Sequence, residues 1–300
     1  MKPKTGDQMK VSVIIPTLNA GKDLPDLLRM LLKQERPADE ILVVDSASED
    51  NTIEICKACD AVSLIQIKRE EFDHGGTRDM ALRKTSGDIV VFLTQDVIPA
   101  DEHFLENLIA PFSRDEKIAL STGRQLPKSD ATPMEKLVRA YNFPEESSIR
   151  TKEDLPRLGI KTYFCPDVCC AYRREIYLEL GGFDYPLKTN EDMFFASKVI
   201  HAGYSISYTA DAKVYHSHNL TLREQYRRNY IQGYEIEKRK SELGIESYGQ
   251  EGLRMVRYVS GELLKQGRIL SVIRFGFDCC ARKLGNSAGE KACRKEMMKQ

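Results

Sequence analysis

Several features that would assign this chain of 300 residues to a broad class are missing. No apolar run approaches the roughly 18 residues that span a bilayer, and the first residues, "MKPKTGDQMK", lack the apolar stretch of a signal peptide. Basic and acidic side chains balance at 45 each, so no overall field attracts nucleic acid. We therefore expect a cytoplasmic protein that recognises its partners at local sites.

Regularly spaced metal ligands and a dinucleotide fingerprint are missing too. Among the eight cysteines, Cys56 and Cys59 form one CxxC, but Cys165, Cys169 and Cys170 lie far along the chain with irregular spacing. This pattern predicts buried, reduced thiols rather than a zinc site. No GxGxxG follows the first apolar run, which disfavours a dinucleotide cofactor.

Short apolar runs alternate with amphipathic segments over the first part of the chain. The runs span residues 11–16, 40–45, 62–67 and 89–93, and a segment of helical pattern follows each. Such alternation predicts an α/β fold with a mostly parallel central sheet flanked by helices. Residues 123–162 have a weaker pattern, which indicates a long excursion before strands and helices resume.

Small or polar residues follow three of these runs, where parallel strands usually place their ligands. They are Pro16, Thr17 and Asn19 after the first run, Asp45 after the second, and Gln95 and Asp96 after the fourth. A carboxylate at Asp45 can accept a hydrogen bond from a nucleobase or a ribose, but an aspartate there also suits a turn before a helix. The sequence leaves both roles open.

Two further motifs place charge at the predicted starts of helices. In "FDHGGTRD", residues 72–79, two glycines and Arg78 suit an anion, and the alternative is a tight turn that needs positive φ. Glu191 and Asp192 open a later helix, where acids either stabilise the helix dipole or serve as a catalytic base. A structural role is open for both motifs.

Two histidines follow a late apolar segment, in "VYHSHN". His216 and His218 would lie on one side of an extended chain. Two neutral imidazoles near Asp96 would complete an oxygen and nitrogen set for Mn²⁺ or Mg²⁺, whereas a single histidine is usually structural. The pair therefore favours a divalent metal site.

Together these stretches resemble the family 2 glycosyltransferases of the GT-A fold. The matching motifs occur in the family's order over about residues 10–235: "VSVIIPTLNAG", "VVDSASEDNT", "GGTRDMAL", "FLTQD", "GGFD", "NED" and "VYH". "FDHGGTRD", "GRQLP", "NFPEES" and "LGIKTYF" are similar to the bacterial rhamnosyltransferase-like branch. The resemblance implies inverting transfer of a sugar, such as rhamnose from dTDP-rhamnose, to a hydroxyl of a glycan or lipid-linked acceptor in cell-surface polysaccharide synthesis.

The resemblance also implies a role for each candidate residue. Asp192 would be the general base, and Glu191 would help to position the acceptor. Asp96 would hold a divalent metal, Mg²⁺ or Mn²⁺, with His216 and His218. The nucleotide-sugar donor would lie against Pro16, Thr17, Asn19, Asp45, Arg78, Gln95 and Asp96.

Two positions depart from the family's motifs. Thr94 stands where the first aspartate of an Asp-x-Asp metal motif is expected, which leaves one carboxylate. "CPDVCC", residues 165–170, has Pro166 and Asp167 where a Ser-Asn pair is expected, which puts specificity in question. Two alternatives stay open: a nucleotidyltransferase, which should carry a Gly-rich basic loop after the first strand, and a non-catalytic scaffold that binds nucleotide sugars.

The expected division is a catalytic domain over residues 8–243 and a helical C-terminal extension over residues 244–300. Residues 245–300 hold 11 lysines and arginines against 6 acids, and apolar residues recur between the cations. Basic amphipathic helices can lie on an anionic membrane, which here would be a peripheral contact at its inner face. The favoured alternative is packing on the catalytic domain or on a second subunit, in a homodimer.

Overall fold

Strands and helices alternate through the first part of the chain in the computed structural model, which describes residues 9–244 and 249–299. Four strands lie side by side in the order β3-β2-β1-β4, and all four run parallel, as the apolar runs predict. The elements of this part are β1 (Val11–Thr17), α1 (Leu24–Leu31), β2 (Glu40–Asp45), α2 (Thr52–Lys57), β3 (Val62–Gln66), α3 (His74–Lys84), β4 (Ile89–Leu93), β5 (Ile98–Pro99) and α4 (Phe104–Arg114).

The other half of the sheet mixes strand directions, although most strands of the whole sheet run the same way, as predicted. β8 lies antiparallel between β4 and β6, β9 runs parallel to β6, and β5 and β7 run antiparallel to β9. The excursion returns the chain to the end of β4, where the Thr94 amide donates to Val168 O, so β8 must run back along β4. The elements are β6 (Ile118–Leu126), α5 (Pro133–Asn142), β7 (Ser148–Arg150), α6 (Leu155–Leu158), β8 (Cys169–Arg173), α7 (Arg174–Glu179), α8 (Glu191–His201) and β9 (Ser205–Tyr215).

The sheet separates two apolar cores, because side chains on a strand alternate between its faces. In β1, Val13 and Ile15 point into one core and Ile14 points into the other. Helices α1, α2 and α4 cover the first face, and α3, α7 and α8 cover the second. The fold is a three-layer α/β/α arrangement, which confirms the predicted fold class.

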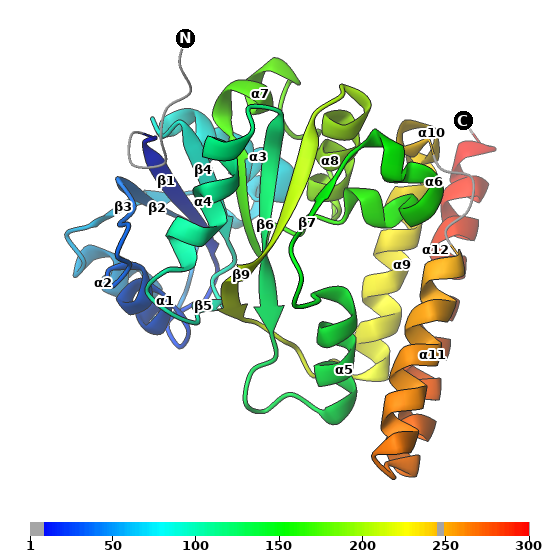
Figure 1. Ribbon diagram of the computed structural model, residues 1–300. Helices are drawn as coiled ribbons and strands as arrows, with labels where there is room; N and C mark the ends of the chain where they lie inside the picture. Colours follow the sequence, from blue (N-terminus) through cyan, green and yellow to red (C-terminus); the bar gives the residue numbers. More distant parts are fainter. Residues whose placement is uncertain (1–8, 245–248, 300) are drawn as a thin grey trace.

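Most strands of the sheet have their carboxyl ends at the same edge. β6 runs in the same direction as β4, because β8 lies antiparallel to both. The arrowhead of β6 points downward in Figure 1, so the ends of β1, β2, β4, β6 and β9 face the lower side of that view. Ligands of open α/β sheets usually bind at such an edge.

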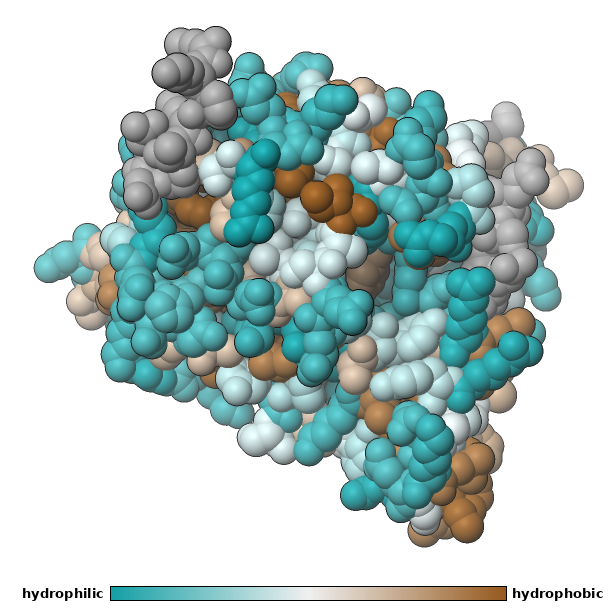
Figure 2. Space-filling model, viewed as in Figure 1, coloured by the Kyte–Doolittle hydropathy of each residue, from teal (hydrophilic) through white to brown (hydrophobic). Residues whose placement is uncertain are grey.

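The lower surface also contains the most apolar part of the view in Figure 2. That face is mostly hydrophilic, and brown residues gather at its lower right, over the lower end of the two helices nearest the C-terminus. Among the described residues, no helix combines the length and the apolar character that crossing a membrane would require.

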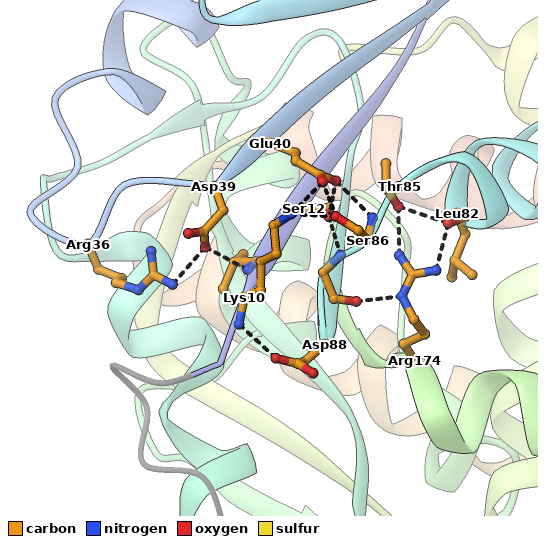
Figure 3. Close-up of polar contacts among 12 residues, drawn as sticks. Lys10, Ser12, Arg36, Asp39, Glu40, Leu82, Thr85, Ser86, Asp88 and Arg174 are labelled. Carbon is orange, nitrogen blue, oxygen red and sulfur yellow. Dashed lines mark hydrogen bonds and ion pairs between the residues drawn. The ribbon is translucent and has the colours of Figure 1, made fainter.

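A polar network joins the opposite, amino ends of β1, β2 and β4 (Figure 3). Glu40 accepts hydrogen bonds from Ser12 Oγ at 2.7 Å and from the Ser86 amide at 2.9 Å, and it pairs with Lys10 Nζ at 2.9 Å. Burial acts to raise the pKa of Glu40, but these donors lower it to about 2. The network fixes the strand starts and leaves the carboxyl edge free for the candidate site.

The helices of the C-terminal part of the chain, all but one of them long, stand beside the sheet (Figure 1). They are α9 (Leu222–Lys238), α10 (Lys240–Leu243), α11 (Gly249–Lys265) and α12 (Ile269–Met297). Gly285 and Gly289 let α12 approach α9, because an added Cβ would lie 2.3 Å from Tyr226 O and 2.0 Å from Tyr230 O. The extension therefore packs on α9, a helix that the predicted boundary at residue 243 assigns to the catalytic domain; the boundary itself stays a prediction.

The predicted burial of the cysteines holds for most of them, whereas Cys280 is exposed. All eight are free thiols, and five of them are buried. Cys165 Sγ and Cys170 Sγ lie 3.1 Å apart inside the core. Within the described part of the chain, no cysteine belongs to a cluster that could hold a metal ion.

Candidate active site

Asp45 anchors the turn that follows β2. Its Oδ1 accepts from Thr17 Oγ1 at 3.0 Å, and its Oδ2 accepts from the Ser48 amide at 2.9 Å. The side chain is fully buried. The turn role is therefore present, and a contact between Asp45 and a nucleobase stays a prediction.

Side chains from neighbouring segments hold the loop that follows β1, the strand that contains Pro16. Asn19 has φ 50°, and its Oδ1 accepts from the Glu49 amide at 2.8 Å. Gln95, just after β4, bonds to both backbone groups of Leu18: its Oε1 accepts from the amide at 2.8 Å, and its Nε2 donates to the carbonyl at 3.1 Å. The predicted donor-binding residues of β1 and β4 thus form one connected rim.

Both predicted histidines converge on Asp96. His216 Nε2 and His218 Nε2 each lie 3.3 Å from Asp96 Oδ2, and the three ligand atoms lie within 4.8 Å of one another. Burial acts to raise the pKa of Asp96, but the side chains of His216, then Thr94, then His218 hold it well below its usual range. Burial also lowers the pKa of both histidines, which favours the neutral ring that can ligate a metal.

The donor set of this cluster fits a divalent cation. Ligands at right angles, about 2.1 Å from an ion, stand roughly 3 Å apart, close to the separation of these atoms. Gln125 Oε1 lies 3.0 Å from His216 Nδ1 and can orient the ring. Thr94 adds no charge, and its backbone amide donates to Val168 O at 3.2 Å. The site therefore offers one carboxylate and two imidazoles.

Asp192 lies in a cluster of charged residues from three segments. Glu191 and Asp192 start α8, Arg78 comes from α3, and Asp167 precedes β8. Arg78 Nη1 lies 3.1 Å from Glu191 Oε1, and Arg78 Nε lies 3.4 Å from Asp167 Oδ2. The Asp167 amide donates to Asp192 Oδ2 at 3.2 Å. Three carboxyl groups thus surround one guanidinium, and the unusual "CPDVCC" segment lies directly beside the predicted base.

Burial, together with the neighbouring acid Glu191, raises the pKa of Asp192 to about 6. Burial is the largest cause and the charge of Glu191 adds to it, while the amides of Met193 and Asp167 and the charge of Arg78 oppose the shift. Burial likewise raises the pKa of Asp167 well above its usual value. A carboxylate with a pKa near 6 suits a general base at neutral pH.

The structure revises the interpretation of "FDHGGTRD". Gly75 and Gly76 lie in the first turn of α3 without positive φ, so the proposed tight turn is wrong. Space requires the first glycine, because a Cβ on it would lie 2.9 Å from Asp184 O. The Gly76 amide donates to Asp73 Oδ1 at 2.8 Å rather than pointing at an anion. Arg78 is 5% exposed, and its predicted donor contact stays a prediction.

Sequence reasoning missed a group of arginines beside the histidines. A cavity of about 240 Å³ is lined by Arg139 of α5, Arg228 of α9 and Arg282 of α12, together with His216 and His218. Arg228 makes no ion pair within the part of the chain that the structure describes; its surroundings lower its pKa, first by burial and then through the charges of Arg139 and Arg282. No local pattern could reveal these residues, because each comes from a different helix.

Known proteins match both the sequence and the fold. The family model "Glycosyl transferase family 2" matches residues 12–181. The O-antigen chain rhamnosyltransferase RfbN of Salmonella typhimurium is 42% identical over 75% of this chain and 72% of its own length. WbaN of Salmonella anatum, of the same description, is 40% identical over 74% of this chain and 70% of its own. The mannosyltransferase PcManGT from Pyrobaculum calidifontis, solved with GDP-Man and Mn²⁺, has a TM-score of 0.65 at 18% identity and covers 94% of this chain and 87% of its own.

Proposed function

The chain belongs to glycosyl transferase family 2, and we propose that it is an inverting, metal-dependent rhamnosyltransferase that extends a polysaccharide. The donor is dTDP-rhamnose, and the acceptor is a hydroxyl of a glycan or of a lipid-linked glycan. Two relatives described as O-antigen chain rhamnosyltransferases support this choice of sugar and product. The cytoplasmic location stays a prediction.

One observation carries the proposal: Asp96, His216 and His218 converge beside a cavity lined by Arg228, which makes no ion pair among the described residues, whereas Arg139 and Arg282 pair with Glu135 and Asp278. A nucleotide diphosphate brings several negative charges, and both a divalent cation and a guanidinium without an acid partner complement them. Arg228 is such a guanidinium among the described residues. The site is therefore suited to a donor whose leaving group is a diphosphate.

Asp192 supplies the base for the acceptor. Its carboxylate takes the proton of the acceptor hydroxyl while that oxygen bonds to the anomeric carbon and the bond from this carbon to the diphosphate breaks. One such displacement inverts the anomeric configuration. Arg78 and Asp167 position Asp192, because Arg78 draws Glu191 and Asp167 together and the Asp167 amide donates to Asp192.

Asp96, His216 and His218 would hold the divalent metal, and the two imidazoles favour Mn²⁺ over Mg²⁺. When bound, the cation would neutralise charge that develops on the departing diphosphate. Gln125 orients His216 through Nδ1, and Arg228 faces the same cavity to bind phosphate oxygens. Gln95 keeps the loop after β1 closed against the end of β4, where the nucleoside is proposed to lie.

Transfer from defined donors tests the proposal. The protein is incubated with a panel of glycan acceptors and with dTDP-rhamnose, UDP-sugars or GDP-sugars, each with Mn²⁺, Mg²⁺ or EDTA, and the masses of the products are measured by mass spectrometry. We expect one added deoxyhexose, release of dTDP, and loss of transfer in EDTA. Asp192→Asn should lower the rate of transfer by about 10²- to 10⁴-fold without lowering the melting temperature. Asp211→Asn, at an exposed position, is the control and should leave the rate of transfer unchanged.

Three outcomes would contradict the proposal. Binding of nucleotide sugars without transfer from any donor would leave the scaffold alternative. Release of pyrophosphate with a nucleotidylated product would identify a nucleotidyltransferase. Full activity of Asp192→Asn would exclude Asp192 as the base.

A further inference from the structure

We propose that the end of the α11–α12 pair is a docking surface for an anionic membrane. This end is called the tip and comprises residues 264–277. The inference rests on the proposed function in one respect, since it concerns how a lipid-linked acceptor meets the site. Its physical basis is separate from the catalytic residues.

The tip exposes large apolar side chains to an unusual extent. Leu270 is 83% exposed and Ile269 is 65% exposed, at the point where the chain turns from α11 into α12. Leu264, Ile273 and Phe277 extend the same surface at 57%, 53% and 60%. Figure 2 shows brown residues gathered at the lower right of the molecule, where the lower end of the α11–α12 pair lies in Figure 1. Contiguous apolar surface of this kind marks an interaction site.

The exposed apolar side chains of the tip do not result from incomplete packing of the helices, because the inner face of the same helices is already packed. Val259, Leu263 and Phe275 are at most 1% exposed and form a small core with Val138 of α5. Ile269, Leu270 and Ile273 lie outside this core. The helix pair is therefore fixed by its inner face, and its outer apolar face is available to a partner.

Charge identifies the partner as an anionic lipid surface. The tip contains Arg268 and Arg274, which make no ion pair among the described residues, and Lys265, which pairs with Glu262 at 2.7 Å. No aspartate or glutamate occurs from Leu263 to Phe277. Apolar side chains flanked by cations match the acyl and headgroup layers of an anionic bilayer. A second copy fits less well, because two tips brought together would oppose like charges.

The tip lies on the same side of the molecule as the site. In Figure 1 the junction of α11 and α12 is at the lower end of the helix pair, and the carboxyl ends of the strands face the same way. Within the described chain, no helix could cross a membrane, so the contact would be interfacial. A membrane beneath this side would bring the sugar of a lipid-linked acceptor toward Asp192 and the arginine cavity.

Vesicle binding by the full-length protein tests the proposal. The protein is sedimented with vesicles of phosphatidylcholine alone or with about one third phosphatidylglycerol. We expect binding to the anionic vesicles that weakens with salt, and little binding to the neutral ones. Ile269→Glu/Leu270→Glu should weaken it by at least about tenfold, because two apolar anchors are lost and negative charge is added. Leu32→Glu, at the end of α1 and 54% exposed, is the control for adding a glutamate at an exposed apolar position.

The outcomes separate this proposal from the proposed function. Transfer to a water-soluble glycan should be equal in the tip variant and in the wild type, whereas transfer to a lipid-linked acceptor in vesicles should fall in the variant only. Absence of binding to anionic vesicles, or equal binding by the tip variant, overturns the membrane surface whatever the activity. A wild-type dimer in light scattering that the tip variant converts to monomer would identify a second copy instead. Absence of transfer with vesicle binding intact would overturn only the enzymatic proposal.

Discussion

Arg78→Met should destabilise the protein far more than its single hydrogen bond to a carbonyl would suggest. The Arg78 side chain is 6% exposed and lies 3.1 Å from Glu191 and 3.4 Å from Asp167. Methionine keeps much of the volume but removes the charge, so both acids lose their partner inside the protein. Breaking a buried pair from one side usually costs about 3–5 kcal/mol, and we expect a loss in that range.

The same helix provides a comparison in which the arginine is exposed. Arg83 lies 2.8 Å from Asp79, and its side chain is 52% exposed, whereas that of Asp79 is 6% exposed and also accepts from Tyr177 Oη at 3.0 Å. Because water reaches Arg83 and the Tyr177 hydrogen bond remains, Arg83→Met should change the free energy of unfolding by only about 0–1 kcal/mol. Adding Glu191→Gln to Arg78→Met should recover part of the loss, because one unpaired acid is removed.

The loss should also depend on pH. Burial already raises the pKa of Asp167 in the folded protein, so this carboxyl favours the folded state when protonated and disfavours it as pH rises through that raised pKa. Removal of Arg78 raises the pKa further. The difference between wild type and Arg78→Met should therefore be larger at pH 8 than at pH 5.

Urea unfolding followed by circular dichroism at both pH values measures these differences. A loss below about 1 kcal/mol, equal to that of Arg83→Met and independent of pH, would refute the idea that Arg78 neutralises buried acids. Such a result would favour the donor-binding role that the sequence suggests for Arg78.

Three other properties can be measured. Because Asp192 acts only when deprotonated and its pKa is raised to about 6, the rate at saturating substrate should fall about tenfold per unit below that pH; a flat profile from pH 5 to 8 would contradict this. Thr94→Asp adds a second carboxylate near Asp96 and should tighten Mn²⁺ binding in calorimetry by about tenfold, with unchanged affinity as the contrary result. Gly289→Ala should destabilise by about 1–3 kcal/mol, since its Cβ would lie 2.0 Å from a carbonyl of α9, while Gly276→Ala, with no atom within 4 Å, should be neutral or stabilising in the same urea titration.

Local sequence patterns predicted the half of the site that parallel strands build. Asp45 and Asp96 end apolar runs, and parallel strands must bring such ends to one edge. The approach of His216 and His218 to Asp96 was predictable on the same ground, because all three follow strands of one sheet. The roles of these residues as donor and metal ligands stay predictions.

The remaining contacts depend on packing that has no local signal. Arg78 and Glu191 are 113 residues apart in the chain, and their pairing appears only when α3 and α8 meet on the second face of the sheet. Arg282 reaches the cavity because Gly285 and Gly289 bring α12 against α9. The antiparallel direction of β8 has no local signal for a similar reason: the excursion decides where β8 enters the sheet.

The position of Arg282 implies that the parts of the site form in a fixed order during synthesis of the chain. Arg139 and Arg282 line one cavity, yet the ribosome makes α5 long before α12. A growing chain can complete the strands β1 to β4 and their rim while the cavity still lacks a wall. The cavity closes only when α12 has docked on α9, so a chain interrupted before α12 has the carboxyl edge of the strands but not the complete cavity.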